Sequence, residues 1–240
     1  MSHCKTLIIT LTAIFFVFCP VALAGETLES VEKKITEKWD KVESMSSKMT
    51  ITTNMTTEGM KAESKGSGTF EYITKDGKEL QRHEMKMTVS YGGSMTMESS
   101  TLMISDGVFL YTLAETMGHK SAVKTRMEDS NFSGSGSKAR FQQLKKESNL
   151  KLLADEKIGG KDAWVIEASA KTPTPGTPFK MKMYFLKDTG AIAKTVGVDG
   201  AGVTVMTLSF TDVKINVKID PSRFVFKAPA GVQVIDMTGK

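Results

Sequence analysis

The sequence predicts a mainly β (α+β) fold, a curved antiparallel half-barrel with an N-terminal helix and a short inserted helix covering the concave face. Three observations predict it. Apolar and polar residues alternate over many short segments, which is typical of half-buried strands. Turn sequences such as Asp-Gly and Gly-Gly separate these segments at regular intervals, which indicates about ten or eleven strands. Two segments have helical spacing instead. An open sheet of that size tends to curl.

The alternation is clearest between His83 and Ile104, where methionine, valine and tyrosine fall on every second residue. A Gly92-Gly93 turn divides this stretch into two strands, and a later segment has the same pattern. Side chains two residues apart in a strand leave the same face of the sheet. We therefore expect one apolar face lined by soft, flexible side chains, and this is the candidate ligand-binding site: Met85, Met87, Val89, Met95, Met97, Phe179, Met181, Met183 and Phe185.

Residues 1–24 are predicted to be a cleaved secretory signal peptide, and residues 25–240 a single domain. Lys5 provides the basic region, Leu7 to Phe18 the apolar region, and Ala22-Leu23-Ala24 the small-residue cleavage site. Cys19 would permit a lipid anchor, but the bulky Phe18 before it disfavours one. We therefore expect a soluble protein exported to the periplasm. Both cysteines lie in the signal peptide, so the mature chain has no thiol and no disulfide.

The first segment with helical spacing runs through Leu28, Val31, Ile35 and Trp39, with Thr27 as N-cap. We expect this helix to end at the serine-rich sequence 44–47. From 114 to 137 the alternation is lost, and the Gly-Ser sequence 133–137 predicts a flexible connector. It leads into a short helix within 138–147, which is either a lid over the sheet or a surface excursion.

The net charge of the whole chain is only +5, and its basic residues are scattered, which excludes a nucleic-acid partner. After the signal peptide only His83 and His119 remain as histidines, and neither has metal-ligand spacing. There is no GxSxG motif and no Walker sequence. We therefore expect no enzyme, no cofactor and no metal requirement.

Several segments together resemble a known family. They are Ile104 to Tyr111 (ISDGVFLY), Gly160 to Glu167 (GKDAWVIE), Met183 to Gly190 (MYFLKDTG) and a closing stretch, Phe224 to Asp236 (FVFKAPAGVQVID). With the signal peptide and the amphipathic helix, this layout resembles the LolA/LolB-like superfamily of outer-membrane lipoprotein-sorting proteins. The carriers of that family have an arginine–proline pair after an early strand, where this chain has Thr74-Lys75-Asp76-Gly77. The resemblance is therefore to a LolA-like protein rather than to LolA itself.

The resemblance implies a periplasmic half-barrel closed by helices over a hydrophobic cavity. It implies a carrier that shelters the acyl chains of lipoproteins or lipids for transfer to the outer membrane, without catalysis. The partners it implies are those acyl chains, an inner-membrane donor protein and an outer-membrane acceptor protein, with transient membrane contact.

From the residues alone, three interpretations of the methionine-rich face stay open. It is the packed core of the sheet, or a reshapable acyl cavity, or a soft-metal site in which His83, Met85 and Met87 bind Cu(I) with Met95 and Met97 as neighbours. A further alternative function is an envelope sensor or regulatory protein that uses the same fold to bind a protein partner.

Overall fold

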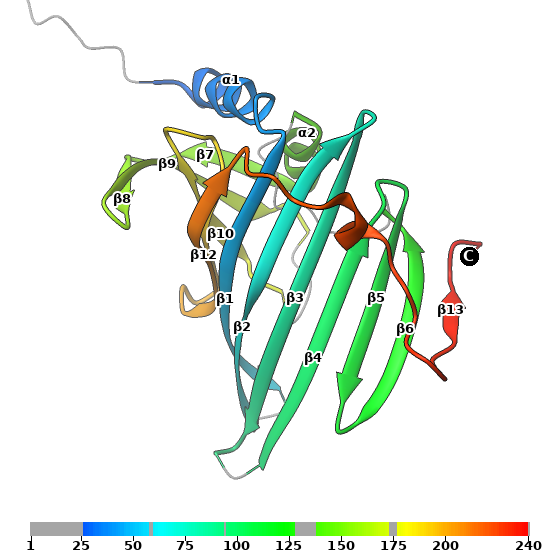
Figure 1. Cartoon of the computed structure of the whole chain (residues 1–240). Coiled ribbons are helices and arrows are strands. Elements are labelled where there is room, and N and C mark those ends of the chain that lie inside the picture. The colour runs from blue at the N-terminus through cyan, green and yellow to red at the C-terminus, as the bar shows by residue number, and fades with distance from the viewer. Residues whose placement is uncertain (1–25, 58–59, 94, 128–137, 173–176, 240) are drawn as a thin grey trace, which may run out of the picture.

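The computed structural model describes residues 26–57, 60–93, 95–127, 138–172 and 177–239. In this part of the chain, thirteen strands form one sheet, and two α-helices and a 3₁₀ turn accompany it (Figure 1). The predicted signal peptide and the Gly-Ser sequence 133–137 lie outside the described residues. None of the helices in the described ranges is long and apolar enough to cross a membrane.

In chain order the elements are α1 (Leu28–Trp39), β1 (Ser44–Thr57), β2 (Met60–Lys75), β3 (Lys78–Tyr91), β4 (Met95–Ser105), β5 (Phe109–Thr116), β6 (His119–Arg126), α2 (Lys138–Glu147), β7 (Ser148–Leu152), β8 (Glu156–Ile158), β9 (Lys161–Ala170), β10 (Lys180–Leu186), β11 (Ile192–Val198), β12 (Thr204–Ile215), the 3₁₀ turn η2 (Pro221–Phe224) and β13 (Val234–Asp236).

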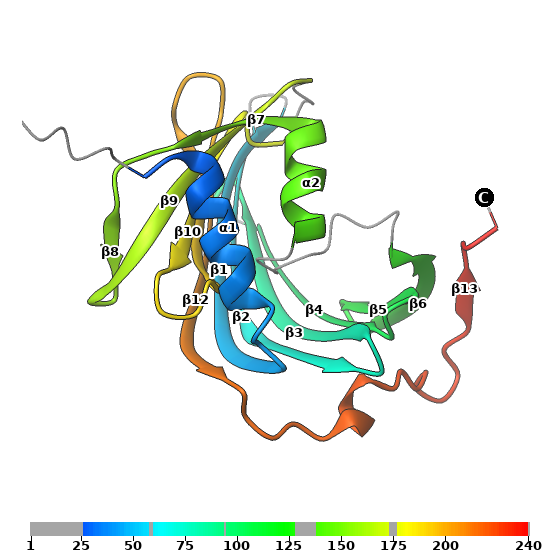
Figure 2. The ribbon, with the colours of Figure 1, turned by 90° about the horizontal axis from the view of Figure 1, so that it is seen from above.

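The strand order is β13-β6-β5-β4-β3-β2-β1-β12-β11-β10-β9-β7, with β8 paired to β9. All neighbours are antiparallel except β13 and β6, which run parallel. The sheet curves around α1 and α2 (Figure 2), which confirms the predicted fold class. The count exceeds the predicted ten or eleven partly because β8 and β13 have three residues each, too few to give a visible alternation.

The prediction that residues from 114 onward lose strand structure is wrong for the part that is described. β5 and β6 form a hairpin there, with its turn at Met117-Gly118. Both turn residues have positive φ, 52° and 80°, as the favoured two-residue hairpin turn requires. The sequence did not predict these strands because Thr112, Ala114 and Thr116, which alternate along β5, have small side chains. They give no alternation of large apolar residues with polar ones.

The N-terminal helix α1 is confirmed. Its N-cap is Thr27, whose side-chain oxygen accepts a hydrogen bond from the Ser30 N–H at 3.2 Å. Val31, Ile35 and Trp39 are its buried stripe. The helix ends at Trp39, not at the serines 44–47, because those serines begin β1, which pairs with both β2 and β12.

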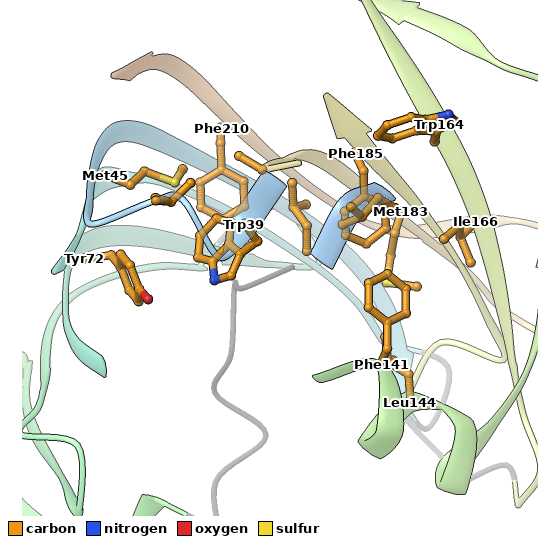
Figure 3. Close-up of a cluster of buried hydrophobic side chains, with 14 of the residues drawn as sticks. Trp39, Met45, Tyr72, Phe141, Leu144, Trp164, Ile166, Met183, Phe185 and Phe210 are labelled. Atoms are coloured by element: carbon orange, nitrogen blue, oxygen red, sulfur yellow. The ribbon is translucent and has the colours of Figure 1, made fainter. Parts of the chain in front are cut away.

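The main hydrophobic core lies where α1 and α2 pack against the sheet (Figure 3). Trp39 of α1 packs on Tyr72 of β2 with ring centroids 5.2 Å apart, and Phe141 of α2 packs on Phe185 of β10 at 5.5 Å. An ion pair between Lys145 and Glu32 links the two helices. The inserted helix thus covers the concave face as predicted, held by Phe141 and by the buried Leu144.

The convex face is covered near its centre by the C-terminal segment, residues 217–237. Phe224 of η2 packs between Ile73 and Ile104. Phe226 stacks on Tyr111 of β5, with ring centroids 5.1 Å apart and an interplanar angle of 10°. The segment then ends as β13 on the outer edge of β6 (Figure 1). The closing stretch Phe224 to Asp236, on which the family resemblance partly rests, therefore packs against the convex face of the sheet.

Candidate functional site

Cross-strand register determines which residues share a face of the sheet, because directly paired residues project from the same side. Met85 of β3 is paired with Gly68 of β2 and with Thr101 of β4, and Gly68 is paired in turn with Met49 of β1. Met49 and Met85 both contact the core beneath the helices. The face that holds Met85 is therefore the concave one.

The same tracing places eight of the nine predicted site residues on the concave face, since β10 joins this face through β9, β11 and β12, while Phe179 precedes the paired residues of β10. They do not form one uniform site. Met183 and Phe185 are buried in the main core, 3% and 1% exposed, where Phe141 packs on Phe185 (Figure 3). Met95 is 60% exposed at the far end. The other six are half-buried: Met85, Met87, Val89, Met97, Phe179 and Met181.

The half-buried residues that lie in paired strands, which are all of them but Phe179, belong to a part of the concave face that continues beyond the core under α1 and α2. We call this part the open face. Its members share intermediate burial and come from β1, β2, β3, β4, β10 and β12: Ile51, Thr53, Ser64, Gly66, Met85, Met87, Val89, Met97, Met181 and Met206. Sequence reasoning found the β3, β4 and β10 residues but missed those of β1, β2 and β12.

The β2 residues were missed because they are small. Ala62, Ser64, Gly66 and Gly68 alternate along β2 and face the concave side between the larger side chains of β1 and β3. A Cβ added at Gly66 would lie 2.8 Å from Ile51 Cγ2 and 3.0 Å from Met87 Cγ. The side chains of Ile51 and Met87 therefore already extend over the row of small residues on β2. The alternation of small residues in a segment of polar composition is the signal that could have located it.

The row of small residues from Ala62 to Gly68 spans six residue steps, or about 20 Å at about 3.3 Å per residue. The hydrocarbon of one membrane leaflet is about 15 Å thick, half of a bilayer core of about 30 Å. A single acyl chain laid along β2 would therefore fit the row end to end. Met85 and Met87, which border it, are the side-chain type that best adapts to ligands of variable shape.

His83 lies at the end of the open face nearest the helices, on a central strand and not at a sheet edge. It is 7% exposed, and its ring packs edge-on against Phe70 at 4.6 Å between centroids. Burial lowers the pKa of His83 to about 3, so the imidazole is neutral at physiological pH. This histidine behaves as part of the packed surface, not as an exposed base.

The methionines expected beside His83 lie elsewhere. Met103 of β4 is its paired residue, whereas Met97 is paired with Val89, six residues farther along β3. Six residue steps correspond to about 20 Å. The structure therefore does not bring His83 together with Met95 and Met97, the neighbours that the copper interpretation requires.

Beyond His83, the charged residues of β3 project from the opposite, convex face, whereas Glu79, near the start of β3, accepts a hydrogen bond from Tyr72 of the core. Glu84 and Lys86 are exposed there. Arg82 donates from Nη2 to Glu84 Oε2 at 2.6 Å and approaches Glu71 with its Nε 3.7 Å away. From His83 to Tyr91, apolar and charged side chains are thus segregated to the two sides of β3. Such an arrangement gives the concave side the chemistry of an apolar binding surface.

No protein-family model matches the sequence, and comparison with curated proteins gives no match. Among solved structures, an uncharacterized conserved protein from Thermus thermophilus is 11% identical with a TM-score of 0.51, and the match covers 87% of this chain and 98% of that one. This likeness shows a shared fold.

Two further solved structures are similar at lower TM-scores. An outer membrane lipoprotein-sorting protein domain from Vibrio parahaemolyticus is 12% identical, with a TM-score of 0.34 and coverage of 82% of this chain and 94% of that chain. The Pseudomonas aeruginosa MucA/MucB complex is 11% identical, with a TM-score of 0.40 and coverage of 81% and 59%. At these scores neither likeness identifies a specific family or function for this chain.

Proposed function

We propose that this protein is a non-catalytic acyl-chain binding protein of the periplasm, a LolA-like carrier that shelters the acyl chains of lipids or lipoproteins on its open face during transfer to the outer membrane. The proposal includes export by the predicted signal peptide at residues 1–24 and a single binding domain at residues 25–240. It also includes brief contacts with a donor at the inner membrane and an acceptor at the outer membrane.

One observation supports the proposal above all others: part of the concave face is packed beneath the helices, and another part, rich in methionine, is only half-buried. In a protein whose concave face were merely core, residues such as Met87 and Met206 would be buried as fully as Met183. An apolar surface left partly open in a curved sheet is a typical ligand-binding surface.

The energetics suit a carrier. Removing an acyl chain from water is worth about 0.8 kcal/mol per buried CH₂, or about 12 kcal/mol gross for a sixteen-carbon chain. A carrier must offset most of the cost of keeping this chain out of the bilayer and still release it. Methionine side chains lose little when they rearrange, because they are unbranched and have three rotatable bonds. Met85 and Met87, which flank the row of small residues, can therefore close over it and make way for a ligand.

The direct test is native mass spectrometry of the protein purified from its envelope fraction, with organic extraction of any bound lipid. We expect about one lipid or acylated peptide per chain. A ligand-free mass, together with no uptake of added fatty acid, would contradict acyl binding and would favour the alternative in which the fold binds a protein partner.

The variant Met87→Glu tests the site itself, since a charge on the open face would have to be desolvated by a bound chain. We expect at least a tenfold loss of fatty-acid affinity. Thr88→Glu is the matched control, because Thr88 is the next residue on the same strand and is exposed on the convex face. Met183 is unsuitable for this test because it is buried in the core, where a charge would unfold the protein. Equal affinities of the two folded variants would contradict the assignment of the open face.

A further inference from the structure

The end of the sheet farthest from α1 presents a set of exposed apolar side chains. We call this set the apolar rim: Met55, Met95, Met117 and Val203. They are 42%, 60%, 75% and 59% exposed. Met55 lies near the end of β1, Met95 begins β4, and Met117 and Val203 lie in the β5–β6 and β11–β12 turns, so antiparallel pairing gives all four positions the same strand end of the sheet. Strand pairing thus gives residues that are far apart in sequence a common end of the sheet.

The opposite end of the sheet has turns of a different kind. The β2–β3 turn is Lys75 to Lys78, with Asp76 and Gly77 at its centre, and the β10–β11 turn contains the exposed Asp188. Val108, in the β4–β5 turn, is the exposed large apolar residue there. Four exposed large apolar side chains thus belong to the rim and one to the opposite end, while Val225, Ile235 and Met237 belong to the C-terminal segment. The turns beside α1 are mainly charged or polar.

The apolar rim is continuous with the open face. One row of directly paired residues crosses four neighbouring strands on the concave side of the sheet: Met55, Ala62, Tyr91 and Met95. The next row inward is Thr53, Ser64, Val89 and Met97, which belongs to the open face. An apolar chain that enters at the rim therefore reaches the open face without an intervening row of charged side chains.

We propose that the apolar rim seats this protein on the surface of a lipid bilayer, with the side chains of Met55, Met95, Met117 and Val203 inserted between head groups. Single apolar side chains on protruding turns suit shallow insertion, which reaches about 5–10 Å into the boundary between head groups and acyl chains. Met55 and Met95 lie on β1 and β4 with two strands between them, so the exposed apolar side chains stand singly, unlike the contiguous surface of about 800 Å² per partner that is typical of a stable protein interface.

Two neighbouring features fit an anionic bilayer as the partner. Tyr91, half-buried in the rim row, is a residue type enriched at membrane interfaces because its ring is apolar and its hydroxyl polar. Lys61 and Lys120 are exposed beside the rim. Lys120 lies 3.7 Å from Glu115, so part of its charge is compensated. Lysines near an anionic surface contribute about 1 kcal/mol each to attraction.

The test uses the protein expressed in full, with removal of the apolar stretch Leu7 to Phe18 checked by mass spectrometry. Binding is measured by co-sedimentation with large vesicles of phosphatidylethanolamine and phosphatidylglycerol. We expect the double variant Met95→Ser and Met117→Asn to lose at least tenfold in apparent partition coefficient. Asparagine is chosen at Met117 because it tolerates the positive φ of 52° at this position. Val108→Ser, at the opposite end, is the control and should bind like the unaltered protein.

The orientation is tested by a fluorophore sensitive to polarity. The chain has cysteines only at positions 4 and 19, so Met95→Cys and Val108→Cys each provide a single labelling site once the signal peptide is removed. A blue shift on vesicles is expected for the label at 95 and not for the label at 108. Equal shifts, no sedimentation of the unaltered protein, or undiminished binding by the double variant would overturn the proposal.

The inference goes beyond acyl binding, and the two can fail separately. Uptake of a soluble fluorescent fatty acid, measured without vesicles, should be unchanged in the rim double variant because the open face is intact. Fatty-acid uptake without vesicle binding would overturn the membrane proposal alone. Vesicle binding without uptake would contradict the proposed carrier function alone.

Discussion

Met87 of β3 lies directly across from Gly66 of β2, and a Cβ added to that glycine would come within 3.0 Å of the Met87 Cγ. The glycine thus leaves room for a long, flexible side chain to fold across the sheet. On the other flank Ile51 approaches the same point at 2.8 Å. The depth of the open face at this point therefore depends on the position of the Met87 side chain. Gly66 allows that side chain to move because it has no side chain of its own.

A large side chain in place of Gly66 should reduce the binding of long acyl chains. In Gly66→Leu the new side chain would occupy the space along β2, and we expect at least a fivefold loss of affinity for a sixteen-carbon fatty acid and a smaller loss for an eight-carbon one. Competition with a fluorescent fatty acid measures both. Ser67→Leu places the same side chain on the convex face and is the control. A uniform loss in both variants would indicate that the row along β2 is not where the chain lies.

Gly68 should tolerate substitution far less than Gly66. A Cβ at Gly68 would lie 1.9 Å from the Glu84 carbonyl oxygen, a main-chain atom of the paired strand that cannot move without displacing β3. We expect Gly68→Ala to lower the free energy of unfolding by more than about 3 kcal/mol, a large effect for a single substitution. Gly66→Ala meets only side-chain atoms and should change it by less than about 1 kcal/mol. Urea denaturation of both variants is the measurement, and similar losses would contradict the close approach of β3.

Burial of His83 predicts a dependence of stability on acid. The pKa of His83 is lowered to about 3, against about 6.5 for a histidine in an unfolded chain. Between these values the unfolded chain binds a proton that the folded protein does not, so the free energy of unfolding falls as the pH falls. This residue should contribute a loss of about 2–3 kcal/mol between pH 7 and pH 4.5.

The measurement is urea denaturation at both pH values for the unaltered protein and for His83→Leu. Carboxylates titrate in the same range and affect both proteins alike, so the difference between the two slopes isolates the histidine. The variant should lose less stability on acidification. An identical loss in both proteins would show that His83 gains a proton as readily in the folded state as in the unfolded one.

The C-terminal segment should detach when its buried anchor is removed. Phe224 is 3% exposed between Ile73 and Ile104, and we expect Phe224→Ala to cost about 3–5 kcal/mol of local packing. Trypsin should then cleave after Lys218 or Lys227 several times faster, because both lysines flank the loosened part. Val225→Ala, at an adjacent residue that is 58% exposed, is the control. Equal cleavage rates in the two variants would contradict the role of Phe224 as anchor.

The sequence by itself determined the features that depend on neighbouring residues. Alternation assigned Met85, Met87 and Val89 to one face, because the side-chain period of a strand is a local property. Spacing of three and four located α1 and its buried stripe, and the Asp76-Gly77 and Gly92-Gly93 turns divided the strands. The short helix at Lys138–Glu147 was also found in this way.

Only the tertiary structure decided which face is concave, because curvature arises from packing between distant segments. Pairing across the sheet, which no local pattern encodes, set Met103 and not Met97 opposite His83. It also brought Gly66 beneath Met87, and Met55, Met95 and Met117 to one end. Burial separated residues with the same alternation: Met183 became core because Phe141 and its helix cover that part of the sheet, and Met87 stayed half-exposed because they do not.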